Sequence, residues 1–176
     1  MFARINSLGV YALNGFSVSV EADISGGLPQ FTIVGLPDSA VREATDRVRS
    51  ALKNLSFVWP VSRITVNLRK TGPVYDLPVL LAILAASGQL PVPGPEDAFI
   101  GELSLDGGVR SVTGVLPMAL AAVQQGVRRL FVPAENAAEA AAAGALCVYP
   151  VHTALDAVRH LTGEAPIEPA QPAAFA

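Results

Sequence analysis

The sequence predicts an α/β fold in which helices cover a layered sheet, and two observations support this. Hydrophobic residues make up 51% of the 176 residues and charged residues only 15%, which is typical of a chain that buries a sheet within one ordinary domain. Segments that alternate apolar and polar residues, as half-buried strands do, are also interspersed with segments whose apolar residues recur every three or four positions, as in helices.

The first elements are expected to form a β-hairpin. Residues 16–25 place apolar side chains at every even position, from Phe16 to Ile24, with polar side chains between them. This is the pattern of a strand with one buried face. The preceding residues 2–13 also look extended, and Asn14-Gly15 is a strong hairpin signal. We therefore expect the two strands to pair antiparallel around that dipeptide.

Strand and helix patterns then alternate along the chain. A helix is expected to begin at Asp38, as its N-cap, because apolar residues recur at helical spacing from Val41 to Leu55. Residues 77–86 are apolar throughout, which predicts a helix buried on most sides. The other expected strands are 31–34, 63–68, 98–105, 109–112, 130–132 and 146–149, and the other expected helices are 115–125, 134–143 and 153–161.

One domain is expected over residues 1–163, followed by a linker over residues 164–176. The linker carries three prolines and no periodicity, which is typical of an extended connection, here to a further module. No apolar run approaches the ~20 residues that a membrane span needs, and the start of the chain lacks the pattern of a signal peptide. We therefore expect a cytoplasmic location and no membrane contact.

Basic residues are concentrated in one stretch of the chain. Residues 42–70 hold seven of the twelve Lys and Arg residues but only two of the fifteen acids, so this segment carries +5 against −8 elsewhere. Clustered cations are the usual basis of affinity for nucleic acid, whereas the alternative is a solvated helix face without a ligand. The candidate DNA-binding residues are Arg42, Arg47, Arg49, Lys53, Arg63, Arg69 and Lys70.

The common sequence signatures of catalysis and metal binding are absent. The chain has no Gly-x-x-x-x-Gly-Lys-Ser/Thr loop for phosphates, no Gly-x-Ser-x-Gly, no His-Glu-x-x-His and a single cysteine, Cys147. We therefore expect no metal and no cofactor in this chain, and no enzyme activity. Asp76 is expected to cap the buried helix that follows it. One alternative stays open, a divergent hydrolase in which Asp76 acts with Lys70.

Several motifs closely resemble the N-terminal domain of the ComM/YifB family of Mg-chelatase-related AAA+ proteins. They lie at Gly27–Glu43, Arg47–Asn54, Arg63–Leu68, Tyr75–Pro78, Ile83–Gln89, Gly101–Gly107 and Gly114–Ala122, so the resemblance covers about residues 1–162. It implies a mixed sheet with helices in a ribosomal protein S5 domain 2-like fold, which is also the fold of the Lon proteolytic domain.

The resemblance also implies a function for the intact protein. Family members of the ComM type are bacterial hexameric motors that migrate branched DNA during natural transformation. ATP and Mg²⁺ are then expected in an AAA+ module that this chain lacks. The expected partners are that module, other copies in a homo-hexamer, and branched or single-stranded DNA. For this chain we expect a non-catalytic scaffold that serves ring assembly or guides DNA; a protein-interaction module that uses the proline-rich loop 91–95 is a further alternative.

The similarity to Lon proteases permits a test of catalysis. Those enzymes use a Ser nucleophile in a Gly-Pro-Ser-Ala-Gly context and a Lys base in the helix after a Gly-Glu strand. Here Gly72-Pro73 is followed by Val74 at the nucleophile position, and an ungapped count from Gly101-Glu102 places Met118 at the lysine position. Neither side chain can act as nucleophile or base, so this dyad cannot hydrolyse peptides.

One departure from the family lies at residues 68 and 69. Members usually carry a short insert resembling Ala-Pro-Ala-Asp-Leu there, whereas Leu68 is followed directly by Arg69 in this sequence. Either the protein has a true deletion or a loop is missing from the sequence. The second explanation predicts a Cα–Cα distance between Leu68 and Arg69 well beyond the ~3.8 Å of a bonded pair.

Overall fold

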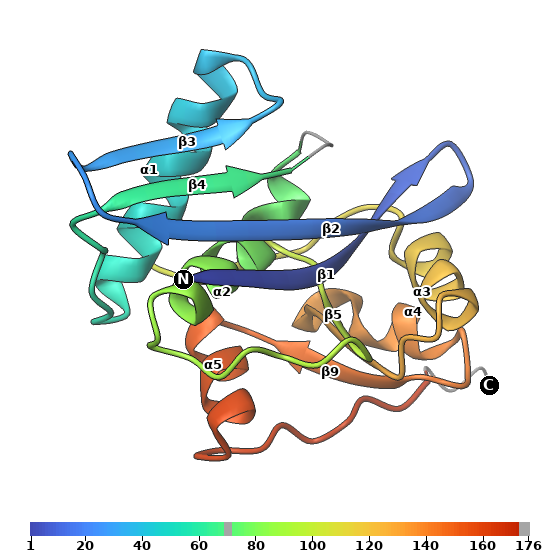
Figure 1. Ribbon diagram of the computed structural model, residues 1–176. Helices are drawn as coiled ribbons and strands as arrows, with labels where there is room; N and C mark the ends of the chain where they lie inside the picture. The colour runs from blue at the N-terminus through green and yellow to red at the C-terminus, as the bar shows by residue number, and fades with distance from the viewer. Residues whose placement is uncertain (69–71, 173–176) are drawn as a thin grey trace.

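The computed structural model describes residues 1–68 and 72–172, which form a seven-stranded mixed sheet with helices on both faces (Figure 1). The expected α/β class is confirmed. The strand order is β3-β4-β2-β1-β5-β8-β9; β1 pairs antiparallel with β2 and β2 with β4, and the remaining neighbours are parallel. The strands are β1 Phe2–Tyr11, β2 Asn14–Ser25, β3 Gln30–Val34, β4 Arg63–Asn67, β5 Asp97–Phe99, β8 Arg129–Pro133 and β9 Cys147–Val151.

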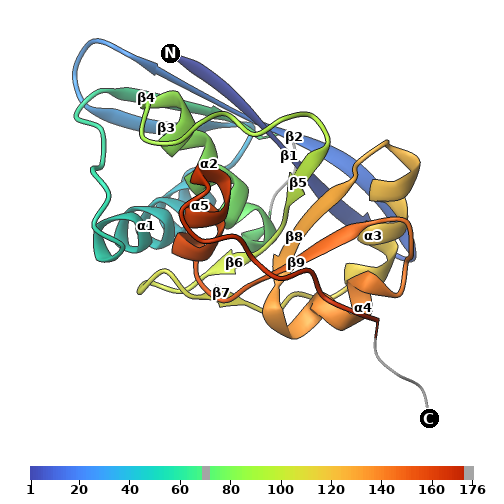
Figure 2. The ribbon, with the colours of Figure 1, turned by 90° about the horizontal axis from the view of Figure 1, so that it is seen from below.

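The helices divide between the two faces of the sheet. Figure 2 shows α1, α2 and α5 on one side of the strands and α3 and α4 on the other. Each side has its own hydrophobic core, one around α2 and one around α3. The helices are α1 Asp38–Asn54, α2 Asp76–Ala86, α3 Val115–Gln124, α4 Ala137–Ala141 and α5 Ala154–Thr162, with short 3-10 helices η1 Pro73–Tyr75 and η2 Ala134–Asn136. None of the helices described is long and apolar enough to cross a membrane.

The opening hairpin is confirmed, but its turn is not where the sequence placed it. Tyr11 pairs with Asn14, so the two turn residues are Ala12 and Leu13, and Asn14-Gly15 belongs to β2. The reason lies in packing, because α3 passes directly over Gly15. A Cβ atom at that position would lie 2.4 Å from the carbonyl oxygen of Pro117. The glycine therefore permits a helix to approach the strand and does not make the turn.

The strand expected over residues 98–105 is divided in two. β5 belongs to the large sheet, whereas β6 (Glu102–Leu103) pairs with β7 (Val109–Arg110) in a separate two-stranded sheet. The break occurs at Gly101, whose N–H donates to the Val74 carbonyl at 2.8 Å and whose carbonyl accepts from the Leu77 N–H at 3.0 Å. The backbone there pairs with the segment that leads into α2, so it cannot continue the ladder of β5.

Three helices have boundaries that differ from those expected. α1 begins at Asp38 itself, so its N-cap is Pro37, and that cap makes no side-chain hydrogen bond. The helix expected over residues 134–143 is a 3-10 turn followed by the short α4. The helix expected over residues 153–161 is α5, which begins one residue later because Thr153 is its N-cap, with reciprocal hydrogen bonds between Thr153 and Asp156.

The segment expected to be a linker lies against the domain as far as it is described. The Ile167 N–H donates to His160 Nδ1 at 2.9 Å, and the Ala170 N–H donates to the Val148 carbonyl at 2.8 Å. His160 packs on the ring of Tyr149 (4.4 Å between centroids), and burial lowers the pKa of its imidazole. The segment therefore rests on α5 and on the outer edge of β9. The expected Leu68–Arg69 separation lies outside the described residues.

The close approach at Gly15 generates a stability prediction. Gly15→Ala should destabilise the protein by about 1–3 kcal/mol, because the new methyl group meets the backbone of α3, and overpacking of this kind forces a shift. The free energy of unfolding in urea is the measurement. Gly26→Ala is the matched control, since nothing lies within 4 Å of a Cβ atom there. Equal unfolding midpoints for the two variants would contradict this account of the Asn14-Gly15 pair.

Candidate functional site

The two positions that resemble the Lon dyad line the same hollow. Val74 comes from η1 and Met118 from α3, and both border a cavity of about 380 Å³. We call this cavity the Val74–Met118 hollow. Its other lining residues are Val10, Pro73, Tyr75, Glu102, Ser111, Val112 and Thr113. The fold thus brings together two residues that are 44 positions apart in the sequence.

Local backbone structure fixes both sides of the Val74–Met118 hollow. Gly72 precedes η1 with a φ of 145°, a conformation that favours glycine, and Pro73 then begins the turn that presents Val74. On the opposite side, the segment that carries Ser111 and Thr113 is held by the side chain of Asn136. That amide accepts from the Val112 N–H at 2.9 Å and donates to the Val112 carbonyl at 3.0 Å. Sequence analysis missed Asn136, because its partner is 24 residues away.

The polar groups in the hollow do not form a nucleophile–base pair. No hydrogen bond among the described residues joins the Ser111 or Thr113 hydroxyl to another lining side chain. Burial raises the pKa of the Tyr75 phenol, which keeps it neutral. Lys53, the one lysine in the described part of the chain, is exposed on α1 and does not line the hollow. The geometry offers a binding surface with one carboxylate, Glu102.

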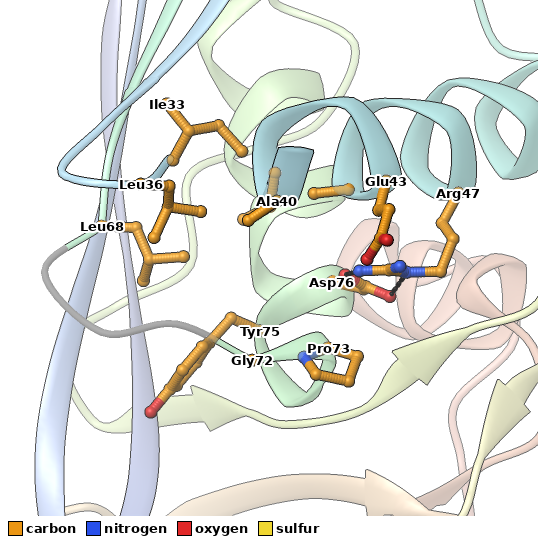
Figure 3. Close-up of a pocket in the computed structure, with 12 residues that line it drawn as sticks. Ile33, Leu36, Ala40, Glu43, Arg47, Leu68, Gly72, Pro73, Tyr75 and Asp76 are labelled. Carbon is orange, nitrogen blue, oxygen red and sulfur yellow. Dashed lines mark hydrogen bonds and ion pairs between the residues drawn. The ribbon is translucent and has the colours of Figure 1, made fainter. Parts of the chain in front are cut away.

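A largely buried ion pair joins α1 to α2 and lines a separate pocket, which Figure 3 shows. This pocket shares Pro73 and Tyr75 with the Val74–Met118 hollow. Arg47 donates from Nε to Asp76 Oδ2 at 2.6 Å and from Nη2 to Asp76 Oδ1 at 3.1 Å. The Leu103 N–H donates to the same carboxylate at 3.2 Å. The Asp76 side chain is only 3% exposed and that of Arg47 is 25% exposed. This bidentate arrangement is the strong form of an arginine–carboxylate contact.

The ion pair with Arg47 affects both the pKa of Asp76 and its expected role as a helix cap. Burial raises the pKa of the Asp76 carboxyl, and the hydrogen bond from Arg47 opposes that rise. The same bond raises the pKa of the Arg47 guanidinium. The expected capping of α2 by Asp76 is wrong, because its N-cap is Tyr75 and no side chain bonds there. Lys70, the other half of the alternative hydrolase, lies outside the described residues.

Four of the seven candidate DNA-binding residues are exposed. Arg42, Arg49 and Lys53 lie on the outer side of α1, and Arg63 begins β4. None of the four makes an ion pair with any side chain that the structure describes, whereas Arg4, Arg128, Arg129 and Arg159 all do. We call these four residues the cationic surface. Arg47 points inward to Asp76, and Arg69 and Lys70 lie outside the described residues.

The proline-rich loop and the single cysteine, also considered from the sequence, lie apart from these sites. The loop at residues 91–95 is largely exposed and is tied to β1 by a hydrogen bond from the Asn6 amide to the Pro95 carbonyl at 3.0 Å. Cys147 begins β9 and is partly buried. Across residues 1–68 and 72–172, no three His, Cys, Asp or Glu side chains gather in a way that could hold a metal ion.

These features define a class of protein, an α/β domain with a seven-stranded mixed sheet and a hollow that Val74 and Met118 both line. Comparison with known proteins then shows the family. Residues 20–136 match the family described as subunit ChlI of Mg-chelatase, and the chain belongs to that family.

Several relatives are similar over most of the chain. Competence protein ComM of Haemophilus influenzae is 45% identical over 153 residues, which cover 84% of this chain, and YifB of Escherichia coli is 40% identical over 138 residues, which cover 75%. The Lon protease of Clostridioides difficile is 25% identical over 147 residues, 77% of this chain and 19% of that protein. The chain spans only 30% of the length of ComM and 27% of YifB.

The buried ion pair generates a second prediction. Asp76→Asn should lower the free energy of unfolding by about 2–3 kcal/mol, because Arg47 then keeps a charge in a largely buried position and loses the carboxylate that it binds directly. Chemical denaturation measures the loss. Glu21→Gln is the matched control, since Glu21 pairs with Arg4 at the surface and its loss should cost less than about 1 kcal/mol. Similar effects of the two substitutions would show that water replaces the Asp76 carboxylate at little cost.

Proposed function

We propose that this chain is a non-catalytic scaffold domain of a Mg-chelatase-like AAA+ protein, with a ribosomal protein S5 domain 2-like fold. The observation that carries the proposal is the Val74–Met118 hollow. Val74 and Met118, the two positions that the resemblance aligns with the Lon dyad, both line it. An aliphatic side chain and a thioether therefore stand where acyl transfer would need a nucleophile and a base. Peptide hydrolysis also needs a base bonded to the nucleophile. Among the described residues, no hydrogen bond joins the Ser111 or Thr113 hydroxyl to Glu102, the one carboxylate of the lining.

We assign ATP and Mg²⁺ binding to a module outside this chain. The sequence has no phosphate-binding loop, so ATP and Mg²⁺ would be held by an AAA+ module that follows the described domain. The length of the relatives supports this, because ComM and YifB are both more than three times as long as the matched part. Assembly of a homo-hexamer and docking onto that module are the scaffold roles we propose.

A second role, the guiding of DNA, is favoured by the cationic surface. Exposed arginines elsewhere in the described chain mostly have a carboxylate partner, whereas Arg42, Arg49, Lys53 and Arg63 have none. Cations left without partners are available to displace counter-ions from a phosphate backbone. The name of the competence protein ComM, which is 45% identical over the matched region, is consistent with a DNA substrate for the intact protein.

The absence of a dyad generates a third prediction. The chain should release no peptides from an unfolded protein substrate above the rate of a buffer blank, and a serine-directed fluorophosphonate should label no residue. Ser111→Ala and Thr113→Val should behave like the wild type, because neither hydroxyl is hydrogen-bonded to a base among the described residues. Mass spectrometry of products and of the labelled protein tests both points. Cleavage that either substitution abolishes would establish a divergent hydrolase.

The cationic surface generates a fourth prediction, best tested by titration of forked and single-stranded DNA over a range of salt concentrations. Replacing Arg42, Arg49 and Arg63 together by Gln should lower the slope of log K against log[salt] for single strands by about 2, since each phosphate contact contributes roughly 0.7. The control variant replaces three arginines outside this surface, Arg4, Arg110 and Arg128, and should keep the wild-type slope. Negligible binding by every variant would leave assembly as the sole role.

A further inference from the structure

Figure 1 shows β3 at one edge of the sheet, next to α1. A further hollow is lined by residues of these two elements and of the loop before β4. It measures about 210 Å³ and we call it the Trp59 hollow. Its walls come from three separate segments, the start of β3, the outer side of α1 and the loop before β4. The residues that matter below are Gln30, Phe31, Arg49, Trp59 and Ser62. Sequence analysis did not find this site, because no aromatic residue lies within the helical run of cations itself.

Aromatic rings form one wall of the Trp59 hollow. The rings of Phe31 and Trp59 lie 5.5 Å apart at an interplanar angle of 43°. Both side chains are half-buried and pack against the core around α2. This packing fixes the positions of the two rings. A fixed aromatic face that remains partly exposed is suited to stacking a planar group.

A cation is held at the same wall. The Arg49 guanidinium carbon lies 5.7 Å from the centroid of the Trp59 ring. This contact orients the side chain but uses none of its five N–H donors. Arg49 has no carboxylate partner among the described residues, and Lys53 follows it one turn later on α1. An anionic group beside a stacked ring would therefore meet donors that are already in place.

Polar groups at the rim are also available. The backbones of Gln30 and Ser62 bond to one another, with the Gln30 N–H donating to the Ser62 carbonyl at 3.4 Å. Their side chains, an amide and a hydroxyl, make no hydrogen bond to any described group. Both types of group can pair with the edge of a nucleobase.

The size of the hollow limits the ligand. At about 210 Å³ it is smaller than the roughly 300–1,000 Å³ of pockets that enclose a drug-sized molecule. It has room for one ring-sized group while the remainder of the ligand stays outside. No acidic residue lines it, and the cationic surface adjoins it on α1. A polyanion that carries planar groups fits these conditions better than a proline-rich peptide, which would leave Arg49 without a partner.

We propose that the Trp59 hollow binds one base of single-stranded DNA, with the ring stacked on Trp59 and the adjoining phosphate on Arg49. This inference rests on the DNA-guiding role proposed above and names the site at which it occurs. Arg42 and Lys53 then contact neighbouring phosphates, so the strand follows the outer side of α1. The stacked base gives the domain a preference for unpaired strands, because a base within a duplex cannot offer its face.

The single tryptophan makes a direct test possible. Trp59 is the only tryptophan of the chain, so tryptophan fluorescence, excited selectively over the three tyrosines, reports on this hollow alone. The titrants are an oligothymidylate of about 12 nucleotides, within the usual range of site sizes, and an abasic oligonucleotide of the same length and charge. The thymidylate should quench the fluorescence of Trp59, whereas the abasic strand should bind more weakly without quenching it.

Variants then measure the contribution of the ring. Trp59→Leu should weaken binding of labelled oligothymidylate, followed by anisotropy, on the order of 5- to 100-fold, which is the usual effect of losing one base–aromatic stack. Trp59→Phe should retain most of the affinity, and this variant also guards against a loss of folding. Tyr11→Leu is the matched control, because Tyr11 is an exposed aromatic residue at the hairpin tip and should leave affinity unchanged.

The outcomes separate this inference from the function on which it rests. Equal binding of thymidylate and abasic strands, without quenching, would overturn base stacking but retain DNA guiding by charge. Failure of both strands to bind at low salt would overturn both proposals. Quenching by a proline-rich peptide, with none by the oligonucleotide, would assign the hollow to a protein partner and overturn the inference.

Discussion

The structure depends on the complete enclosure of α2 and on the one charge that this helix carries. Every residue from Asp76 to Ala86 is buried, so α2 has no face on which water could satisfy a polar group. The Asp76 carboxylate would be costly there on its own. Arg47 of α1 and the Leu103 N–H of β6 donate hydrogen bonds to this carboxylate. The Asp76 carboxylate thus links α1, α2 and β6 through the ion pair and the Leu103 hydrogen bond.

The same contact sets the rotation of α1 about its axis. Arg47 must point inward to reach Asp76, and successive residues of a helix are about 100° apart. Arg42, Arg49 and Lys53 then lie about 200–240° around the helix from Arg47, on the side away from α2. The exposed cations of the proposed DNA surface and the inward arginine are therefore consequences of a single orientation, although they occur as one basic run in the sequence.

Periodicity predicted most of the fold, because it reflects contacts that each element makes along its whole length. It placed β1, β2, α1, α2, α3 and α5 within a few residues. The turn expected at Asn14-Gly15, the unbroken strand expected across Gly101 and the capping role expected of Asp76 were all wrong, and the reason is shared. In each case a contact with a segment distant in sequence decided the role of the residue: Pro117 over Gly15, Val74 and Leu77 against Gly101, and Arg47 against Asp76. The resemblance to Lon led to Val74 and Met118, which do share a hollow, whereas Trp59 and Asn136 carried no local signal.

The enclosure of α2 also affects how the molecule opens. Elements on several sides of the helix, including α1, β1, β2 and β6, pack against it, so no single loop or terminal segment can move aside and admit solvent to its backbone. Its amide hydrogens should exchange with water only when the whole domain unfolds. The hairpin tip, whose Tyr11 and Leu13 side chains are exposed, can fray independently of that event. The core around α2 should therefore unfold in a single cooperative step under heat or force, while only peripheral segments open locally. Such a domain would be suited to act as a rigid spacer.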